Sequence, residues 1–392
     1  MKQRLPTIVV NKNTPFIFEA FSQLGNIRML GTSEVTPDAV RDADILIVRS
    51  ETRVDRDLLE GSSVRFVGTP TIGTDHVDLE YLTGHGIVFA NAPGSNANSV
   101  AEYVAAALLA WADRTGTSLG GRSIGIVGVG NVGSKVVNVA RALGMVPILN
   151  DPPRMRESGD ASFKSLDELM DADVISLHVP LTRTGEDKTW HLFDASRIGK
   201  MKKGPVLINT SRGPVVDTPA LAAAISSSRI SAAILDVWEN EPDISVELVK
   251  AVFLGTPHIA GYSLEGKLNA LEAIYAEVCR FLKVPHEGLP DGIRPANEAG
   301  MTVPSNVTAE SAIVRECVRQ AYDIESDDEM LRKIGERSGN GRAEYFSGLR
   351  SGYRVRREFG CRTVGLLPEQ SKAARVLQQL GFAVRVKEGL HV

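Results

Sequence analysis

The sequence has few cysteines, little excess of charge and no long apolar run. Its three cysteines, Cys279, Cys317 and Cys361, are far apart among 392 residues and have no metal-ligand spacing. This pattern excludes a disulfide scaffold and favours a reducing, cytoplasmic compartment. The 44 basic and 48 acidic residues leave a net charge of −4. A nucleic-acid partner is therefore not expected, because no global positive field is present to attract phosphates.

Membrane and secretion signals are also missing from the sequence. No apolar run reaches the ~20 residues of a membrane span, and the first residues lack the apolar segment of a signal peptide. We therefore expect a cytoplasmic protein without a membrane partner. Hydrophobic residues make up 43% and charged residues 23%, which is typical of a globular protein, and the length suggests two or three domains.

Short apolar segments alternate with helical patterns over most of the chain. Near-continuous apolar strands separated by helices are typical of parallel sheets that are covered on both faces. This alternation predicts an α/β fold with two similar doubly wound, Rossmann-like units. The expected strands fall in two series: residues 7–10, 44–49, 64–68 and 87–90, then residues 123–128, 146–149, 173–178, 206–209 and 232–236.

Two long helices and a linker divide the chain further. Apolar side chains recur at helical spacing in residues 98–114 and again in residues 263–283. Four prolines and three glycines in residues 284–304 have the composition of a linker. A third, small α+β domain of about 90 residues is predicted beyond it. Its expected elements are a helix at 309–322, a strand at 363–367, a helix at 370–380 and a strand at 382–386.

Gly128, Gly130 and Gly133 form a G-x-G-x-x-G pattern between an expected strand and a helix. The three glycines suit a tight turn, close approach of the backbone to a pyrophosphate, and helix–strand packing. Asp151 lies 18 residues after Gly133, close to the ~20-residue offset of a carboxylate that binds ribose hydroxyls and repels a 2′-phosphate. The pattern predicts NAD binding, although Arg154 leaves NADP open. The alternative is a glycine turn in an unrelated α/β protein.

Four charged residues lie at or just after the ends of later expected strands, where open parallel sheets bind ligands. Arg212 can bind a carboxylate through two parallel hydrogen bonds. His258 can accept a hydroxyl proton as hydride leaves, and a carboxylate such as Glu241 or Asp236 can fix the imidazole. Either Arg212 or His258 alone is better explained as an ordinary surface or loop residue. Their joint placement predicts a dehydrogenase that acts on a 2-hydroxy acid.

These residues and their neighbours resemble the NAD-dependent D-2-hydroxyacid dehydrogenase family. The resemblance rests on the glycine pattern with Asp151 and on residues 209–213, 236–242 and 256–258. It implies a catalytic triad of Arg212, Glu241 and His258, with His258 as acid/base, and interleaved domains with the active site in a cleft between them. Asp236 would hold the nicotinamide carboxamide. The implied cofactor contacts are Gly128, Gly130, Asn131, Val132, Gly133, Asp151, Val179, Thr210, Ser211, Arg212, Asp236 and Gly261.

A narrower resemblance covers essentially the whole chain. Residues 46–50, 66–78, 151–154, 258–267 and 322–382 resemble the branch of this family that oxidises 4-phospho-D-erythronate in vitamin B6 synthesis. It implies substrate contacts from Ser50, Thr71 and Tyr262 and a homodimer formed through the C-terminal domain. The expected domains are 1–97 with 262–288 for substrate, 98–261 for NAD and 289–392 for dimerisation.

Several alternatives stay open at this point. Within the class, the chain could be a phosphoglycerate, glycerate or hydroxypyruvate dehydrogenase, and outside it an NAD-sensing binding protein on the same fold. No metal is predicted, because His76 has no second ligand at metal spacing, and His178 is expected to line the cofactor cleft without exchanging a proton. A further phosphate candidate, weakened because a charge run is usually a solvated face, is the group Arg350, Arg354, Arg356, Arg357 and Arg362.

Overall fold

The computed structural model describes residues 4–202, 204–297, 300–304 and 306–386. The chain divides into two compact units, residues 1–96 with 263–296 and residues 97–262 with 297–392. Each unit is assembled from two separate stretches of sequence, so the two are interleaved. None of the helices in the described part of the chain is long and apolar enough to cross a membrane.

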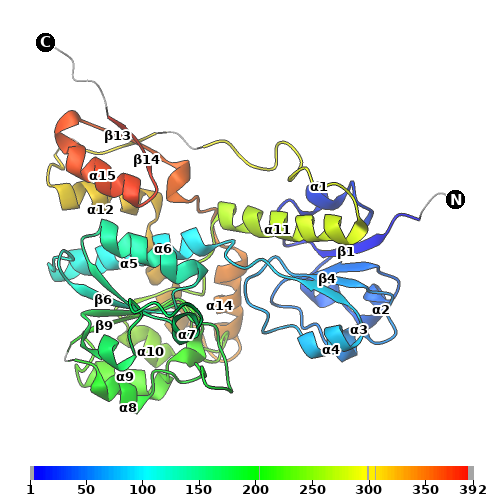
Figure 1. The fold of residues 1–392 in the computed structure, drawn as a ribbon, viewed down its shortest axis with the longest axis horizontal. Coiled ribbons are helices and arrows are strands. Elements are labelled where there is room, and N and C mark those ends of the chain that lie inside the picture. The colour runs from blue at the N-terminus through cyan, green and yellow to red at the C-terminus, as the bar shows by residue number, and fades with distance from the viewer. Residues whose placement is uncertain (1–3, 203, 298–299, 305, 387–392) are drawn as a thin grey trace, which may run out of the picture. The chain divides into compact units, whose positions relative to one another are not determined.

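The first unit contains a five-stranded parallel sheet in the order β2-β1-β3-β4-β5. Helices α1 and α11 pack on one face of this sheet, and α2, α3 and α4 pack on the other (Figure 1). The strands are β1 (Thr7–Asn11), β2 (Asn26–Leu30), β3 (Ile45–Ile47), β4 (Phe66–Gly68) and β5 (Val88–Ala90). The helices are α1 (Ile17–Phe21), α2 (Pro37–Val40), α3 (Arg56–Leu59), α4 (Leu79–Gly84) and α11 (Leu264–Leu282).

The second unit contains a six-stranded parallel sheet in the order β11-β10-β9-β8-β6-β7. Helices α5 and α6 cover one face, and α8, α9 and α10 cover the other (Figure 1). The strands are β6 (Ser123–Val127), β7 (Val146–Asn150), β8 (Val174–Leu177), β9 (Val206–Asn209), β10 (Ala232–Leu235) and β11 (Leu254–Gly255). The helices are α5 (Ala97–Thr115), α6 (Asn131–Ala142), α7 (Pro152–Ser158), α8 (Ala195–Lys200), α9 (Thr218–Ser226) and α10 (Val246–Ala251).

The C-terminal part of the second unit carries a small parallel sheet in the order β12-β13-β14. Helices α12 and α15 share a core with α5 and α6, while α13 and α14 add to the core on the opposite face of the large sheet (Figure 1). The strands are β12 (Met301–Thr302), β13 (Thr363–Leu366) and β14 (Ala383–Val386). The helices are α12 (Glu310–Ala321), α13 (Ile324–Arg332), α14 (Gly341–Ser351) and α15 (Ser371–Gln379).

The predicted α/β fold is confirmed, with two doubly wound parallel sheets and a smaller C-terminal sheet. Sequence analysis missed three strands. β2 lies at an edge and is only half-buried, so it lacks the continuous apolar pattern of an interior strand. β11 and β12 have only two residues each, and β12 lies in the stretch that was expected to be a linker. The three predicted domain ranges stay a prediction, and residues 387–392 of the last range lie outside the described residues.

Candidate active site

The turn after β6 is built so that only glycine fits at two of its positions. Gly128 has a φ of 85°, which L side chains rarely adopt, and a Cβ there would lie 2.7 Å from the His178 carbonyl oxygen. A Cβ at Gly133 would lie 1.9 Å from the Gly128 carbonyl oxygen. These contacts close the turn onto β8 and bring α6 against β6, as predicted from the glycine spacing.

The middle glycine of the pattern, Gly130, faces open space. A Cβ added at Gly130 would have no heavy atom within 4 Å, and Gly130 is the residue that precedes α6. Asn131 and Val132 form the first turn of that helix, where backbone N–H groups lack helical partners and the helix dipole is positive. The turn therefore fits the diphosphate of a dinucleotide.

Asp151 links the glycine turn to the next helix. One carboxylate oxygen accepts from the Val129 N–H at 2.8 Å, and the other accepts from the Arg154 N–H at 3.2 Å. The Arg154 guanidinium donates to the Val129 carbonyl oxygen and lies 5.9 Å from the ring centre of Phe163. The structure thus places the predicted ribose-binding carboxylate beside the glycine turn.

Three more predicted cofactor contacts follow β8 and β9. Val179 follows β8 and His178, and its Cγ1 would lie 2.9 Å from a Cβ added at Gly128. The hydroxyl of Thr210 lies 3.2 Å from His178 Nδ1, and Ser211 donates to Asn209 Oδ1 through its N–H and its hydroxyl, at 3.0 and 2.8 Å. All of them therefore lie near the carboxyl ends of parallel strands, where such sheets bind ligands.

His178 is a neutral side chain in this structure. Its Nε2 lies 2.8 Å from the Ser176 hydroxyl, and burial lowers the pKa of His178 to about 3. The imidazole therefore carries no charge near neutral pH, which supports the prediction that it does not exchange a proton in the reaction.

His258 and Glu241 form a hydrogen-bonded pair after β11 and β10. His258 Nδ1 lies 2.7 Å from Glu241 Oε2, and Glu241 Oε1 accepts from the Trp238 N–H at 2.8 Å. Burial acts to raise the pKa of Glu241, but the charge and hydrogen bond of His258 outweigh burial and hold the pKa below its usual range. An ionised Glu241 fixes the proton of His258 on Nδ1, which leaves Nε2 as the atom that can accept a proton.

Asp236 fixes the turn that carries His258. Its buried carboxylate accepts from the Thr256 hydroxyl at 2.7 Å and from the N–H groups of Ile259 and Ala260 at 2.7 and 2.9 Å. The His258 N–H donates to the Asp236 main-chain oxygen at 2.7 Å, and His258 itself has a left-handed φ of 58°. Burial raises the pKa of Asp236. Sequence analysis missed this positioning role, and the nicotinamide contact stays a prediction.

Arg212 follows β9, and the backbone directly after it passes close to the backbone around Trp238. Its Nη1 donates to the Ser211 carbonyl oxygen at 2.8 Å. A Cβ at Gly213 would lie 2.0 Å from the carbonyl atoms of Trp238, so this position must be glycine. The backbone after Arg212 therefore runs against the segment that leads to Glu241, as expected for residues of one site.

Of the three predicted substrate contacts, two lie in the first unit and one in the second. Ser50 follows β3. Thr71 follows β4, and its hydroxyl donates to the Gly73 carbonyl oxygen at 3.0 Å and contacts the Thr69 hydroxyl at 2.9 Å. In the second unit, Gly261 and Tyr262 follow the His258 turn directly. All three assignments stay predictions.

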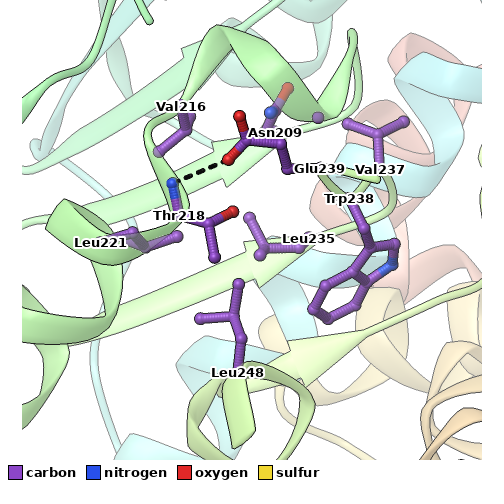
Figure 2. A pocket seen from close by; sticks show the side chains of 10 residues that line it. Asn209, Val216, Thr218, Leu221, Leu235, Val237, Trp238, Glu239 and Leu248 are labelled. Carbon is purple, nitrogen blue, oxygen red and sulfur yellow. Dashed lines mark hydrogen bonds between the residues drawn. The ribbon is translucent and has the colours of Figure 1, made fainter. Parts of the chain in front are cut away.

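One group in the described residues has the composition of a metal site and was not singled out from the sequence: His191, Asp217 and Glu239. His191 Nε2 lies 2.7 Å from Glu239 Oε1. The Thr218 N–H donates to Glu239 Oε2 at 3.2 Å (Figure 2). Glu239 also lines a cavity of about 10 Å³, which is room for about one water molecule. Both Glu239 oxygens already have hydrogen-bond partners. These bonds connect the segments around His191, Thr218 and Glu239.

Comparison with known proteins agrees with this geometry. The family described as "D-isomer specific 2-hydroxyacid dehydrogenase, NAD binding domain" matches residues 99–260, and "Domain of unknown function (DUF3410)" matches residues 295–381. A solved D-lactate dehydrogenase from Aquifex aeolicus, complexed with NAD and lactic acid, is 29% identical, with a TM-score of 0.60 over 71% of this chain and 95% of that chain. The matching family and the fold identify the chain as an NAD-dependent oxidoreductase that acts on a CH–OH group.

Full-length relatives narrow the class. The erythronate-4-phosphate dehydrogenase of Klebsiella pneumoniae is 43% identical over 96% of this chain and 97% of the relative. The enzyme of the same name from Salinibacter ruber is 46% identical over 91% of this chain and 93% of the relative. The chain belongs to the erythronate-4-phosphate dehydrogenase family.

Proposed function

We propose that this chain oxidises the C2 hydroxyl of 4-phospho-D-erythronate with NAD, giving (R)-3-hydroxy-2-oxo-4-phosphooxybutanoate for pyridoxal 5′-phosphate biosynthesis. The observation that carries the proposal is the 2.7 Å bond between His258 and Glu241, on a chain whose full-length relatives are named for this substrate. A hydroxy acid can be oxidised only if its hydroxyl proton is removed while hydride leaves C2.

In this mechanism His258 Nε2 accepts the proton of the C2 hydroxyl. Ionised Glu241 keeps the imidazole in the correct tautomer and stabilises the imidazolium that forms. Arg212 binds the C1 carboxylate and polarises the C2 oxygen. NAD, when bound, would supply the acceptor for the hydride that leaves C2. Asp236 positions His258 through the turn that follows β11.

The same proposal assigns the nucleotide contacts. The diphosphate would bind the N-terminus of α6 over Gly130, and Asp151 would accept from the ribose hydroxyls and disfavour a 2′-phosphate. Asn131, Val132, Val179, Thr210, Ser211, Asp236 and Gly261 complete the proposed set, with Ser50, Thr71 and Tyr262 as substrate contacts. Residues 98–261 would form the NAD-binding domain, 1–97 with 262–288 the substrate domain and 289–392 the dimerisation domain.

A cytoplasmic homodimer formed through the C-terminal part completes the proposal. Val355, Leu367 and Val386 are 74%, 46% and 49% exposed in that part, and burial of apolar side chains against a second copy would stabilise a dimer. Light scattering coupled to gel filtration tests the assembly. A monomeric mass at micromolar concentration would contradict it.

The test of the reaction is NADH formation by the purified protein, followed by absorbance or fluorescence. The substrates are 4-phosphoerythronate, 3-phosphoglycerate and glycerate, each with and without a 2-oxo acid as electron acceptor. Selective oxidation of 4-phosphoerythronate is the expected result. A preference for either other acid would keep the cofactor and the His258–Glu241 pair but replace the substrate. Binding of NADH without turnover of any acid would favour an NAD-sensing protein.

A further inference from the structure

An arginine of the C-terminal part contacts the loop that carries His258. Arg350 lies in the last turn of α14, and its Nη2 donates to the Tyr262 hydroxyl at 3.3 Å. Its guanidinium carbon also lies 5.9 Å from the centre of the Tyr262 ring. The ring of Tyr353 meets the same tyrosine edge-on, with centroids 6.1 Å apart. Tyr262, a predicted substrate contact, is therefore held by residues of the C-terminal part.

Arg350 also acts on the catalytic pair. Burial works to raise the pKa of Glu241, whereas His258, the Trp238 N–H and then the positive charge of Arg350 lower it. Arg350 is thus close enough to Glu241 for its charge to be felt. Proton transfer by His258 needs a carboxylate partner, and Glu241 supplies it. The guanidinium of Arg350 is not needed for that step, so it has a different role.

The neighbouring arginines have other contacts or are buried. Arg354 pairs with Asp327 and donates to the Asp323 carbonyl oxygen. Arg356 is buried, donates to the carbonyl oxygens of Ser99 and Ala260, and lies 4.3 Å from the ring centre of Tyr322. Arg357 is buried as well. Arg350 instead donates to the Tyr262 hydroxyl.

We propose that Arg350, together with the Tyr262 hydroxyl, recognises the phosphate of the substrate, so that the C-terminal part of the chain supplies the specificity for a phosphorylated acid. This inference rests on the proposed function. The substrate carries a carboxylate at C1 and a phosphate at C4, and Arg212 serves only the first. A guanidinium is suited to the second, because its planar N–H groups match phosphate oxygens in pairs.

The test compares 4-phosphoerythronate with erythronate, which lacks only the phosphate. The measured quantity is the ratio of kcat/KM for the two acids, in the wild-type chain and in Arg350→Gln. The ratio should fall roughly 10- to 100-fold in Arg350→Gln, mainly through KM, as expected when one hydrogen bond to a charged group is lost. Arg350→Lys should restore part of it, since lysine keeps the charge without the planar fork. Tyr262→Phe should lower the ratio less than Arg350→Gln.

Arg342→Gln is the matched control, because Arg342 lies on the same helix and its guanidinium donates to the Arg337 carbonyl oxygen. It removes the same charge and should leave the ratio unchanged. An equal loss with both acids in Arg350→Gln would show that Arg350 acts through Glu241 and would overturn the proposal, as would no loss with either. Circular dichroism and NADH binding verify that each variant is folded.

Failure of the proposed function has a different signature. The wild-type chain would then show no preference for 4-phosphoerythronate over erythronate, before any variant is compared.

Discussion

Two histidine–glutamate pairs in the second unit have nearly the same local chemistry. His258 pairs with Glu241 and His191 pairs with Glu239, each across 2.7 Å, and both histidines have a left-handed φ. The two carboxylates are two residues apart in the sequence, and both have a lowered pKa because their hydrogen bonds and the nearby histidine outweigh burial. Neither the histidine–glutamate distance nor the pKa of the carboxylate therefore distinguishes the two pairs.

Their surroundings differ. His258 sits on a turn fixed by Asp236, followed by Tyr262 with Arg350 against it. His191 stacks on Trp190 with ring centres 3.7 Å apart, and both oxygens of Glu239 are occupied. Arg350 and Tyr262 lie beside one pair, and the other pair connects loops. A histidine–carboxylate bond becomes a candidate for catalysis through what lies next to it.

The largest expected difference between the pairs is in turnover. His258→Ala should lower kcat roughly 10²- to 10⁴-fold, the usual contribution of a positioned acid/base, while NADH still binds. Steady-state kinetics and NADH fluorescence titration measure the two effects. If turnover persisted at the wild-type rate, His258 would not be the acid/base.

The next largest effect is expected from the partner carboxylate. Glu241→Gln should lower kcat by roughly 10- to 100-fold, because the imidazole remains but loses its charged partner. Without that negative charge, protonation of the imidazole is less favourable. The acidic limb of the kcat/KM profile for oxidation should therefore move to lower pH. A profile that moves to higher pH would contradict this electrostatic role.

The second pair should affect stability instead of turnover. His191→Gln should leave kcat within a factor of about two and lower the free energy of unfolding by about 1.5–3 kcal/mol, the usual value for a hydrogen bond to a charged group. Urea denaturation of this variant, of Glu239→Gln and of the double variant gives the coupling energy. A large loss of kcat in His191→Gln would put this pair in the catalytic machinery as well.

The smallest effect on catalysis is expected from His178, which has hydroxyl partners and no carboxylate. Its pKa is about 3 in the folded chain, below the ordinary 6.5, so on acidification the unfolded chain takes up a proton before the folded one does. Its contribution to stability is complete above pH 6.5 and is lost as pH falls toward 3, at up to about 1.4 kcal/mol per pH unit.

His178→Gln should therefore flatten the decline of the unfolding free energy between pH 6 and pH 4, as measured by denaturant titration at each pH. An unchanged slope would mean that His178 is protonated in the folded chain.

The strand–turn–helix unit around the glycine pattern could be predicted from local sequence. Gly128 and Gly133 are restricted by backbone contacts within one strand–turn–helix unit, and the spacing of the glycines indicates that unit directly. Helix α11, which packs in the core of the first unit, was predicted from its apolar spacing. The edge strand β2 was missed, since half-exposed residues such as Arg28 interrupt the apolar pattern.

The parts that depend on distant contacts could not be predicted. His191 and Glu239 are 48 residues apart and have no shared motif. The sequence presented Arg350 as one of five similar arginines, and nothing local distinguishes it. Only the packing of α14 against the His258 loop brings its side chain to Tyr262, 88 residues away.

The sequence by itself determined the α/β class, the nucleotide turn and the candidate proton-transfer residues, because strand periodicity, glycine conformation and residue order after a strand are local properties. The tertiary structure decided that the His258–Glu241 pair stands beside Tyr262 and Arg350, and that Asp236 fixes the His258 turn. Those choices depend on which segments pack together, and packing is decided by the burial of side chains from the whole chain.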